Sequence, residues 1–204
     1  MMPLMNGLEL CAKIKNNIEY SHIPVILLTA KVLPEAKVEG FSYGADAYVE
    51  KPFTILQLHM QIRNLLKLRT TFQQHMTSFL PDAKPEEKEE EETGIQLTPQ
   101  DQEFIKKMQE IIEQQLADEG FSIDTLASEM NMSRSNFYRK LKALSGMPPN
   151  DYLKNCRLNK AAQLLKEGYR VTEVFERTGF GSSSYFAKCF KAKFGVLPKD
   201  YISN

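Results

Sequence analysis

The chain has 204 residues, of which 42% are hydrophobic and 25% are charged, and its formal net charge at pH 7 is zero. That length allows one large or two modest domains with real cores. No apolar run approaches the roughly 20 residues of a membrane helix, and the first residues lack the basic and apolar regions of a signal peptide. Cys11, Cys156 and Cys189 are too few and too far apart for a disulfide or metal framework. The sequence therefore predicts a protein of the reducing cytoplasm without a metal site.

The charge is distributed unevenly along the chain. Residues 131–204 contain fourteen Lys or Arg against five Asp or Glu, whereas residues 81–98 contain two against seven. A basic excess of this kind is typical of nucleic-acid binding, although a basic surface that is only solvated gives the same count.

The first 80 residues alternate between helix and strand patterns. We expect helices at Gly7–Asn17 and Pro34–Tyr43, a buried strand at Ile23–Ala30, a short strand at Ala47–Val49, and a long helix from Thr54 to about Leu80. The apolar side of the long helix is expected to hold Leu58, Ile62, Leu65, Leu66 and Phe72. Such alternation predicts a parallel α/β sheet. Two strands are too few for one, so we expect the chain to begin inside a domain.

Four segments carry a family pattern at matching spacing: Met1–Gly7, Pro24–Ala30, Gly44–Tyr48 and Lys51–Phe53. In these residues the chain resembles the second half of a response-regulator receiver domain, a flavodoxin-like α/β fold that is truncated here. The resemblance implies that the phosphoacceptor aspartate lies two residues before Met1, with the acidic pair that binds Mg²⁺ further upstream. We therefore expect no cofactor in this chain, and Mg²⁺ only in the full-length receiver.

The same resemblance assigns receiver roles to two residues. Thr29 matches the switch hydroxyl, and Lys51 matches the lysine that contacts the phosphoryl group; each can hydrogen-bond a phosphoryl oxygen. The Lys51–Pro52 bond matches the family's cis peptide. Asp46 and Glu50 lie outside the register of the phosphoacceptor, so a small phosphodonor is expected to label nothing in this chain. Without the family spacing, Thr29 is a strand end and Lys51 a surface residue.

Pro81–Gly94 separates this part from the rest of the chain. It contains two prolines and a run of carboxylates but no aromatic or large aliphatic side chain, which predicts a flexible, self-repelling linker. The acidic run could also compete with DNA for the basic residues. We expect a receiver part with its connecting helix at 1–80, an acidic disordered linker at 81–97, and an all-α domain at 98–204.

The all-α domain is expected to begin with a helix capped by Thr98, with Pro99 at its first position and Gly120 at its end. Ser122 then caps a short helix, and Ser133 caps the next one. A helix from Asp151 to about Glu167 connects this pair to a second pair, Val171–Val174 and Ser182–Lys193.

Ser133–Tyr152 is repeated in Ser182–Tyr201. At a shift of 49 residues, nine of twenty positions are identical, whereas average composition gives about one or two matches. Each copy has a serine cap, an apolar stripe at helical spacing and an opposite polar face, which is the pattern of a helix-turn-helix. A single helix of this kind is more simply part of a core. The repeat, the basic excess and the caps together favour DNA reading.

In Gly179–Phe180, Ser184–Phe186, Phe190–Lys191 and Gly195–Pro198 the chain is similar to the AraC/XylS family of bacterial transcription regulators. This resemblance implies that Ser135, Tyr138 and Arg139 of the first unit, and Ser183, Ser184 and Lys188 of the second, face bases. The whole DNA-binding set is Arg134, Ser135, Tyr138, Arg139, Lys142, Ser183, Ser184, Tyr185, Lys188 and Lys191. Phe175 stands where the family usually has a small residue against the recognition helix.

The main hypothesis is a sequence-specific DNA-binding transcription regulator of a two-component phosphorelay that binds double-stranded promoter DNA. RNA polymerase and a second copy of the chain are further candidate partners, and no small-molecule substrate is expected. The alternatives are a signalling or dimerisation module that works through protein contacts, and the tail of a hybrid histidine kinase. The sequence contains no catalytic dyad, phosphate loop or metal cluster, so any kinase activity is expected upstream of Met1.

Overall fold

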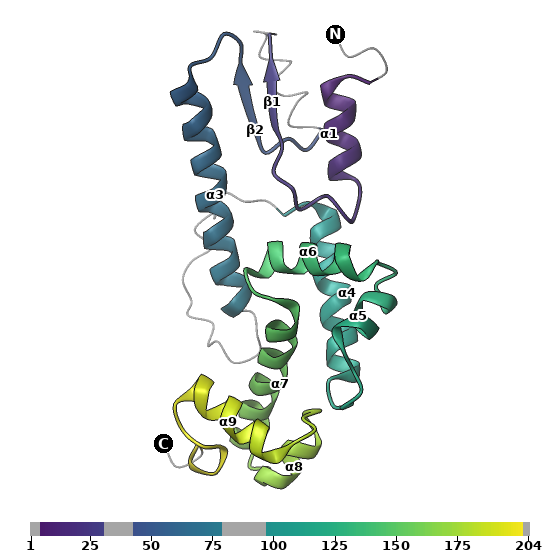
Figure 1. Cartoon of the computed structure of the whole chain (residues 1–204), viewed down its shortest axis with the longest axis vertical. Helices are drawn as coiled ribbons and strands as arrows, with labels where there is room; N and C mark the ends of the chain where they lie inside the picture. The colour runs from purple at the N-terminus through teal and green to yellow at the C-terminus, as the bar shows by residue number, and fades with distance from the viewer. Residues whose placement is uncertain (1–4, 31–42, 79–96, 202–204) are drawn as a thin grey trace. The chain divides into compact units, whose positions relative to one another are not determined.

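A computed structural model describes residues 5–30, 43–78 and 97–201 of the chain (Figure 1). They cluster into two compact units: the first runs to Gln73 and includes the start of the fourth helix as far as Lys106, and the second contains that helix from Lys107 and everything after it. The expected helix at 34–43 and the acidic linker lie almost wholly outside the described residues. Within these ranges, no helix has both the length and the hydropathy to cross a membrane.

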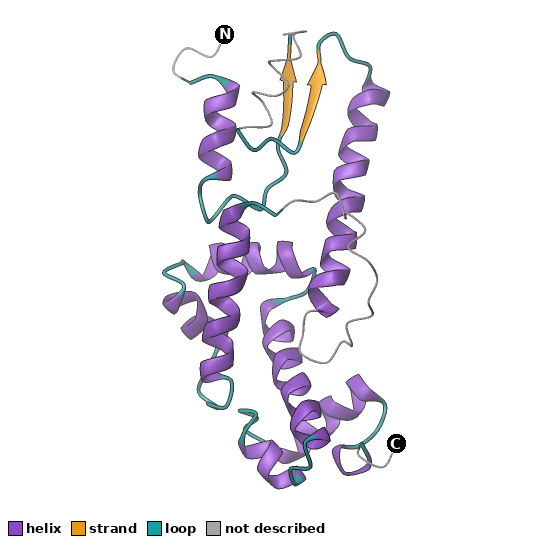
Figure 2. Cartoon of the chain, turned by 180° about the vertical axis from the view of Figure 1, so that it is seen from behind, coloured by secondary structure: helices purple, strands orange, loops and turns teal. Residues whose placement is uncertain are grey.

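Among its described residues before helix α4 (Pro99–Gln115), the first unit contains a short helix, two strands and most of a long helix (Figure 2). Helix α1 (Gly7–Lys15) begins at Asn6, whose side chain accepts from the Glu9 N–H at 2.9 Å while the Glu9 carboxylate accepts from the Asn6 N–H at 3.1 Å. Strands β1 (Ile26–Thr29) and β2 (Ala47–Glu50) pair in parallel, with Ile26 opposite Ala47. The strands lie between α1 and α3 (Figure 1).

Helix α3 (Ile55–Ser78) forms where the long helix was expected. Of the five residues expected on its apolar side, Leu58 and Leu65 are half-buried, whereas Ile62 and Leu66 are 39% and 56% exposed. The side chain of Phe72 lies outside the described part of the chain. A two-stranded sheet covers only a narrow strip of a helix, and the rest of its apolar surface remains outside.

The second unit is helical, and its elements repeat in order. The helices are α4 (Pro99–Gln115), α5 (Ile123–Glu129), α6 (Arg134–Ser145), α7 (Pro149–Lys166), α8 (Val171–Glu176) and α9 (Ser183–Phe194), followed by the 3₁₀ turn η1 (Pro198–Asp200). Helix α5 contacts α6 and α7, and α7 contacts α8 and α9. Helix α7 thus lies between the two helix-turn-helix units (Figure 1).

The repeated residues have the same structural roles in both copies. Ser133 and Ser182 are N-caps whose side chains accept from Asn136 N–H at 3.3 Å and Tyr185 N–H at 3.4 Å. Gly146 and Gly195 end α6 and α9 at φ 75° and 80°, a left-handed conformation in which glycine carries little penalty. The sequence repeat therefore corresponds to two helices of equal length, 49 residues apart.

Helix α4 ends at Gln115, five residues before the expected stop at Gly120. The Asp118 N–H donates to the Gln115 carbonyl at 2.9 Å, and the Asp118 carboxylate accepts from the Gly120 N–H at 2.8 Å. An aspartate that folds back on its own backbone forms a turn that competes with the helix. The start agrees with expectation, because the Thr98 hydroxyl accepts from the Asp101 N–H at 3.1 Å.

Candidate nucleic-acid interface

Helix α6 has a buried face and a polar face, as the first helix-turn-helix requires. Phe137, Leu141 and Leu144 are at most 5% exposed. On the remaining surface, Tyr138 is half-buried, and the exposed residues are Arg134, Ser135, Arg139 and Lys142. All five side chains predicted for DNA contact in this unit therefore lie outside its core.

Helix α9 has the same division. Phe186 and Phe190 are buried, and the half-buried Phe194 packs against the same core cluster. The five residues predicted for DNA contact are all exposed: Ser183, Ser184, Tyr185, Lys188 and Lys191. Burying the aromatic stripe leaves these hydroxyl and ammonium groups accessible to a ligand from solvent.

The two arginines of α6 are held by neighbours that the sequence did not single out. The Arg139 guanidinium donates to the Asn136 side chain, and Arg134 Nε lies 2.9 Å from Asp124 Oδ1 on α5. The second pair is open to solvent on both sides, and such pairs contribute only about 0–1 kcal/mol. Asp124 therefore holds Arg134 only weakly. The spacing of Asn136 and Arg139 is a local signal of their contact, but nothing local connects Asp124 to Arg134.

Tyr185 of α9 lies in a small polar group with α7. Its hydroxyl hydrogen-bonds Cys189, which raises the pKa of Tyr185. Lys154 donates to Asp151 at 2.6 Å, and this hydrogen bond raises the pKa of Lys154. At neutral pH the tyrosine hydroxyl is thus protonated and the lysine charged, which suits both groups to donate to phosphate oxygens.

Phe175 of α8 packs against the recognition helix of the second unit, as its unusual identity predicts. Its ring centroid lies 6.2 Å from that of Phe186, and Phe180 lies 5.1 Å from Phe186. Aromatic pairs at such distances stabilise a core beyond the area they bury. The large residue is thus accommodated in an aromatic cluster that also contains Phe190, at 5.7 Å from Phe186.

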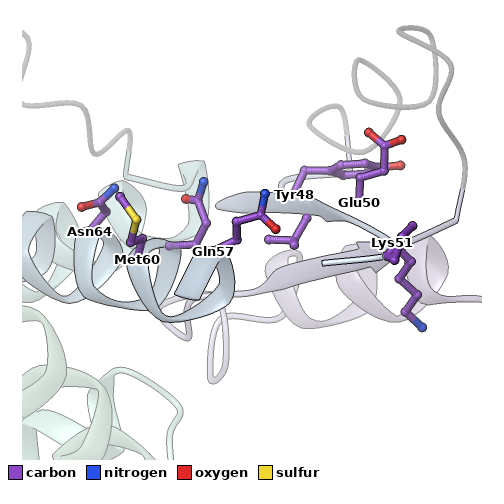
Figure 3. A pocket seen from close by; sticks show the side chains of 9 residues that line it. Tyr48, Glu50, Lys51, Gln57, Met60 and Asn64 are labelled. Carbon is purple, nitrogen blue, oxygen red and sulfur yellow. The ribbon is translucent and has the colours of Figure 1, made fainter. Parts of the chain in front are cut away.

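The two receiver residues meet where the parallel strands end. The Lys51 N–H donates to the Thr29 carbonyl at 2.6 Å, and Lys51–Pro52 is a cis peptide as expected. Thr29 is half-buried and Lys51 is exposed. Lys51 and Pro52, together with residues of β2 and α3, line a cavity of about 430 Å³. Lys51 extends away from Gln57 and Asn64 on its wall (Figure 3).

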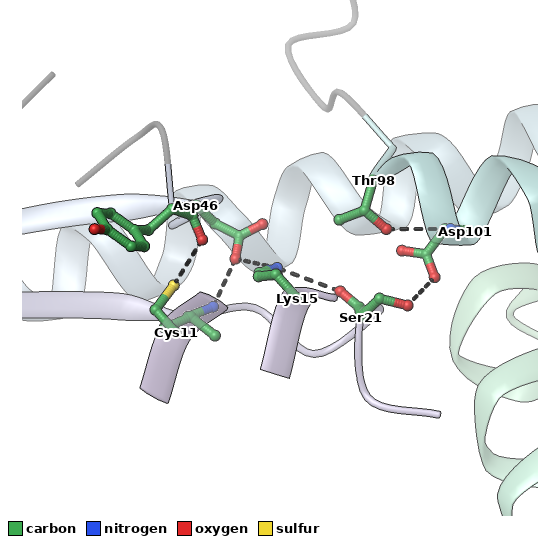
Figure 4. Close-up of polar contacts among 8 residues, drawn as sticks. Cys11, Lys15, Ser21, Asp46, Thr98 and Asp101 are labelled. Carbon is green, nitrogen blue, oxygen red and sulfur yellow. Dashed lines mark hydrogen bonds and ion pairs between the residues drawn. The ribbon is translucent and has the colours of Figure 1, made fainter. Parts of the chain in front are cut away.

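Asp46, which the sequence excluded as a phosphoacceptor, is part of the scaffold of the first unit (Figure 4). Its carboxylate lies 2.6 Å from Lys15 Nζ and accepts from the Val25 N–H at 2.6 Å. The buried Lys15 also donates to the Ser21 carbonyl at 3.4 Å, and the Ser21 hydroxyl donates to the buried Asp101 carboxylate at 2.7 Å. Asp46 thus connects α1 to the residue before β1.

Two family models match the chain. Residues 1–63 match the response regulator receiver domain, and residues 126–204 match the helix-turn-helix domain. The chain therefore joins part of a receiver domain to a helix-turn-helix domain. This confirms the expected fold, a partial α/β receiver followed by an all-α domain with two helix-turn-helix units.

Similar proteins include a "Histidine kinase P4" of Formosa agariphila, which is 35% identical over 98% of this chain and 14% of its own length. The response regulator ArlR of Staphylococcus aureus is 45% identical over 33% of this chain and 29% of its own length. This chain thus spans less than a third of either relative. The solved C-terminal domain of the response regulator yesN of Fusobacterium nucleatum aligns with 49% of this chain and 98% of its own, at 30% identity and a TM-score of 0.46.

Proposed function

We propose that the chain reads a specific sequence in double-stranded promoter DNA with α6 and α9. The observation that carries the proposal is that these two helices have equal length, the same cap at each end and the same division between buried apolar and exposed polar residues. An exposed polar helix on a helix-turn-helix is the element that enters the major groove. Helix α7 has 18 residues, or about 27 Å at 1.5 Å per residue, which suits grooves about 34 Å apart.

The two units are not equivalent in their proposed base contacts. Arg139 and Tyr138 of α6 correspond to Lys188 and Ala187 of α9. An arginine fork matches the two acceptors of a guanine edge, whereas a lysine is a point charge and alanine cannot hydrogen-bond through its side chain. We infer that α6 supplies most of the base-specific readout and that the DNA site is asymmetric.

The Arg139→Ala substitution is expected to weaken binding to the best duplex by about 1–3 kcal/mol and to relax the preference at one base pair. The duplex is obtained by selecting a random library with the wild-type chain, and affinity is measured by fluorescence anisotropy on that duplex and its single-base variants. Arg63→Ala, at an exposed position of α3, is the matched control. An unchanged base preference in Arg139→Ala would remove Arg139 from the groove.

We also propose that Thr29 and Lys51 respond to a phosphoryl group in the complete receiver. A hydroxyl and an ammonium group can both donate to phosphoryl oxygens, and the two residues are adjacent at the ends of β1 and β2. Among the described residues, no three Asp, Glu, His or Cys side chains gather into a group that could hold a metal ion. No step through Mg²⁺ is therefore assigned to this chain.

A second candidate function, a module that works through protein contacts, is favoured by the surface of α3. Ile55, Leu56 and Met60 are 89%, 68% and 57% exposed, and large apolar side chains clustered on a surface mark interaction sites. A second copy of the chain and RNA polymerase are the candidate partners. If contact through α3 is the main function, light scattering is expected to show self-association of the wild-type chain and none of Leu56→Glu. The wild-type chain is then also expected to select no duplex from the random library.

Alignment of nearly the whole chain with part of a histidine kinase favours a third arrangement, in which these domains are the output end of a hybrid kinase. DNA reading by α6 and α9 is common to this arrangement and to a free regulator. The coding sequence upstream of Met1 distinguishes them, since a kinase domain in frame is expected only for the hybrid.

A further inference from the structure

Arg157 connects the helix α7 to the turn between α4 and α5. Its Nη2 atom donates to the carbonyl oxygens of Asp118 at 2.9 Å and Phe121 at 3.0 Å. Burial lowers the pKa of Arg157, and the Asp118 and Glu119 carboxylates oppose that shift. The group stays charged, because arginine does not lose its proton in proteins, and hydrogen bonds from a charged donor are the stronger kind. The first helix-turn-helix unit is thus tied to the middle of α7.

The second helix-turn-helix unit also lies against the turn between α4 and α5. Gly179 is buried at φ 65°, and a Cβ atom there would lie 2.4 Å from the Leu116 carbonyl oxygen and 3.0 Å from Arg157 Nε. A Cβ on Gly181 would lie 2.2 Å from the Glu119 carboxylate. At position 179 only glycine allows the two backbones to approach this closely, whereas the neighbour of Gly181 is the end of the Glu119 side chain, which can move. Residues 179–181 directly precede Ser182, the N-cap of α9.

Three parts of the second compact unit therefore meet at one point: the turn at residues 116–121, the Arg157 side chain, and residues 179–181. We call this group the bridge. The Arg157 Nε–H is buried there without a hydrogen-bond acceptor among the described residues. A buried donor left unpaired costs free energy, so the position of Arg157 is set by its Nη2 bonds and by the space that Gly179 leaves.

We propose that the bridge fixes the distance and angle between α6 and α9, and so makes the spacing of the two DNA segments a determinant of specificity. This inference rests on the proposed function. One inserted base pair shifts the second segment by about 3.4 Å and rotates it by about a tenth of a turn. Two rigidly connected helices cannot follow that change without losing contacts, whereas two loosely connected helices can.

The geometry is tested first without DNA. Two nitroxide labels are introduced as unnatural amino acids at the exposed positions 142 and 191, so that the three cysteines stay in place. Electron spin resonance then measures the distribution of distances between the two nitroxides. Arg157→Gln is expected to broaden that distribution, and Arg177→Gln, at an exposed arginine stacked on Tyr169, to leave it unchanged. Circular dichroism establishes that each variant is folded. If the Arg157→Gln chain is folded and keeps the wild-type distribution of distances, the proposal that the bridge fixes α6 relative to α9 is wrong.

The second arm uses a duplex selected by the wild-type chain, with one base pair inserted between the two protected segments. The affinity of the wild-type chain is expected to be about tenfold or more lower for the inserted duplex than for the parent duplex, as for a mismatch. For Arg157→Gln the ratio between its affinities for the same two duplexes is expected to be clearly smaller. Equal ratios would overturn the proposed effect on specificity. If the wild-type chain selects no duplex, the proposed function fails, and the distance measurement still decides whether the bridge fixes the helices.

Discussion

Binding of the chain to its selected duplex is expected to weaken by roughly fortyfold when salt rises from about 50 to about 200 mM. The proposed faces of α6 and α9 carry five exposed cations. Arg139 and Lys188 are assigned to bases, which leaves Arg134, Lys142 and Lys191 for phosphates. Each cation that neutralises a phosphate releases counterions and contributes about −0.9 to the slope of log affinity against log salt. Three such contacts give a slope near −2.7, which anisotropy titrations at several salt concentrations measure directly.

Single substitutions show how much each residue contributes to the slope of log affinity against log salt. Lys142→Gln is expected to reduce its magnitude by about one, because one phosphate contact is lost. Lys107→Gln removes an exposed lysine of α4, outside both helix-turn-helix units, and is expected to leave the slope unchanged. A slope near zero in the wild-type chain would instead favour function through protein contacts.

The two helix-turn-helix units of the second compact unit were predictable from the sequence because their signals are local. A serine before each recognition helix, a glycine after it and an apolar stripe at helical spacing are all contained within about fifteen residues, and they occur twice. The structure gives each of these residues the expected role. The same local rules placed α1, β1, β2 and α3 within a few residues of their observed bounds.

Features that depend on tertiary contact were not predictable. Lys140 lies between Arg139 and Leu141 and is fully buried, although its type predicts exposure. Arg157 donates to backbone carbonyls 36 and 39 residues away, and a carbonyl has no residue type to recognise. The outward position of Ile62 and Leu66 depends on how much of α3 the sheet covers, which periodicity alone does not give. The two helices proposed to read DNA were therefore predictable from local patterns, whereas the side chain that joins their units was not.

Gly179 is marked by a local sequence pattern and is also required by a tertiary contact. The family resemblance selects it as part of Gly179–Phe180, without a physical reason. The structure supplies two reasons, a positive φ and contact with the Leu116 carbonyl that leaves no room for a Cβ. A change there acts on the backbone of the second unit and on its position relative to the first, so its effect on DNA binding cannot be assigned to either alone. Arg157→Gln, which leaves the backbone unchanged, is the cleaner test of the bridge.

Phe190→Ala is expected to reduce the free energy of unfolding by about 3–5 kcal/mol, the usual loss when a buried phenylalanine is truncated. Phe190 is fully buried, and its ring centroid lies 4.5 Å from that of Phe194 and 5.2 Å from that of Tyr201. Truncation leaves a cavity between α9 and the chain that follows η1, and these elements cannot close it without moving the recognition helix. Urea unfolding followed by circular dichroism measures the loss.

The repeat provides a matched variant, because Leu141 is buried at the position 49 residues earlier. Leu141→Ala is expected to cost about 2–5 kcal/mol, so the two substitutions destabilise similarly while acting on different helices. If α6 supplies most of the base readout, then under conditions in which both variants are folded, Leu141→Ala relaxes base preference more than Phe190→Ala does. Equal base preference in the two variants would contradict the inferred asymmetry, and a loss below about 1 kcal/mol in Phe190→Ala would contradict its place in the core.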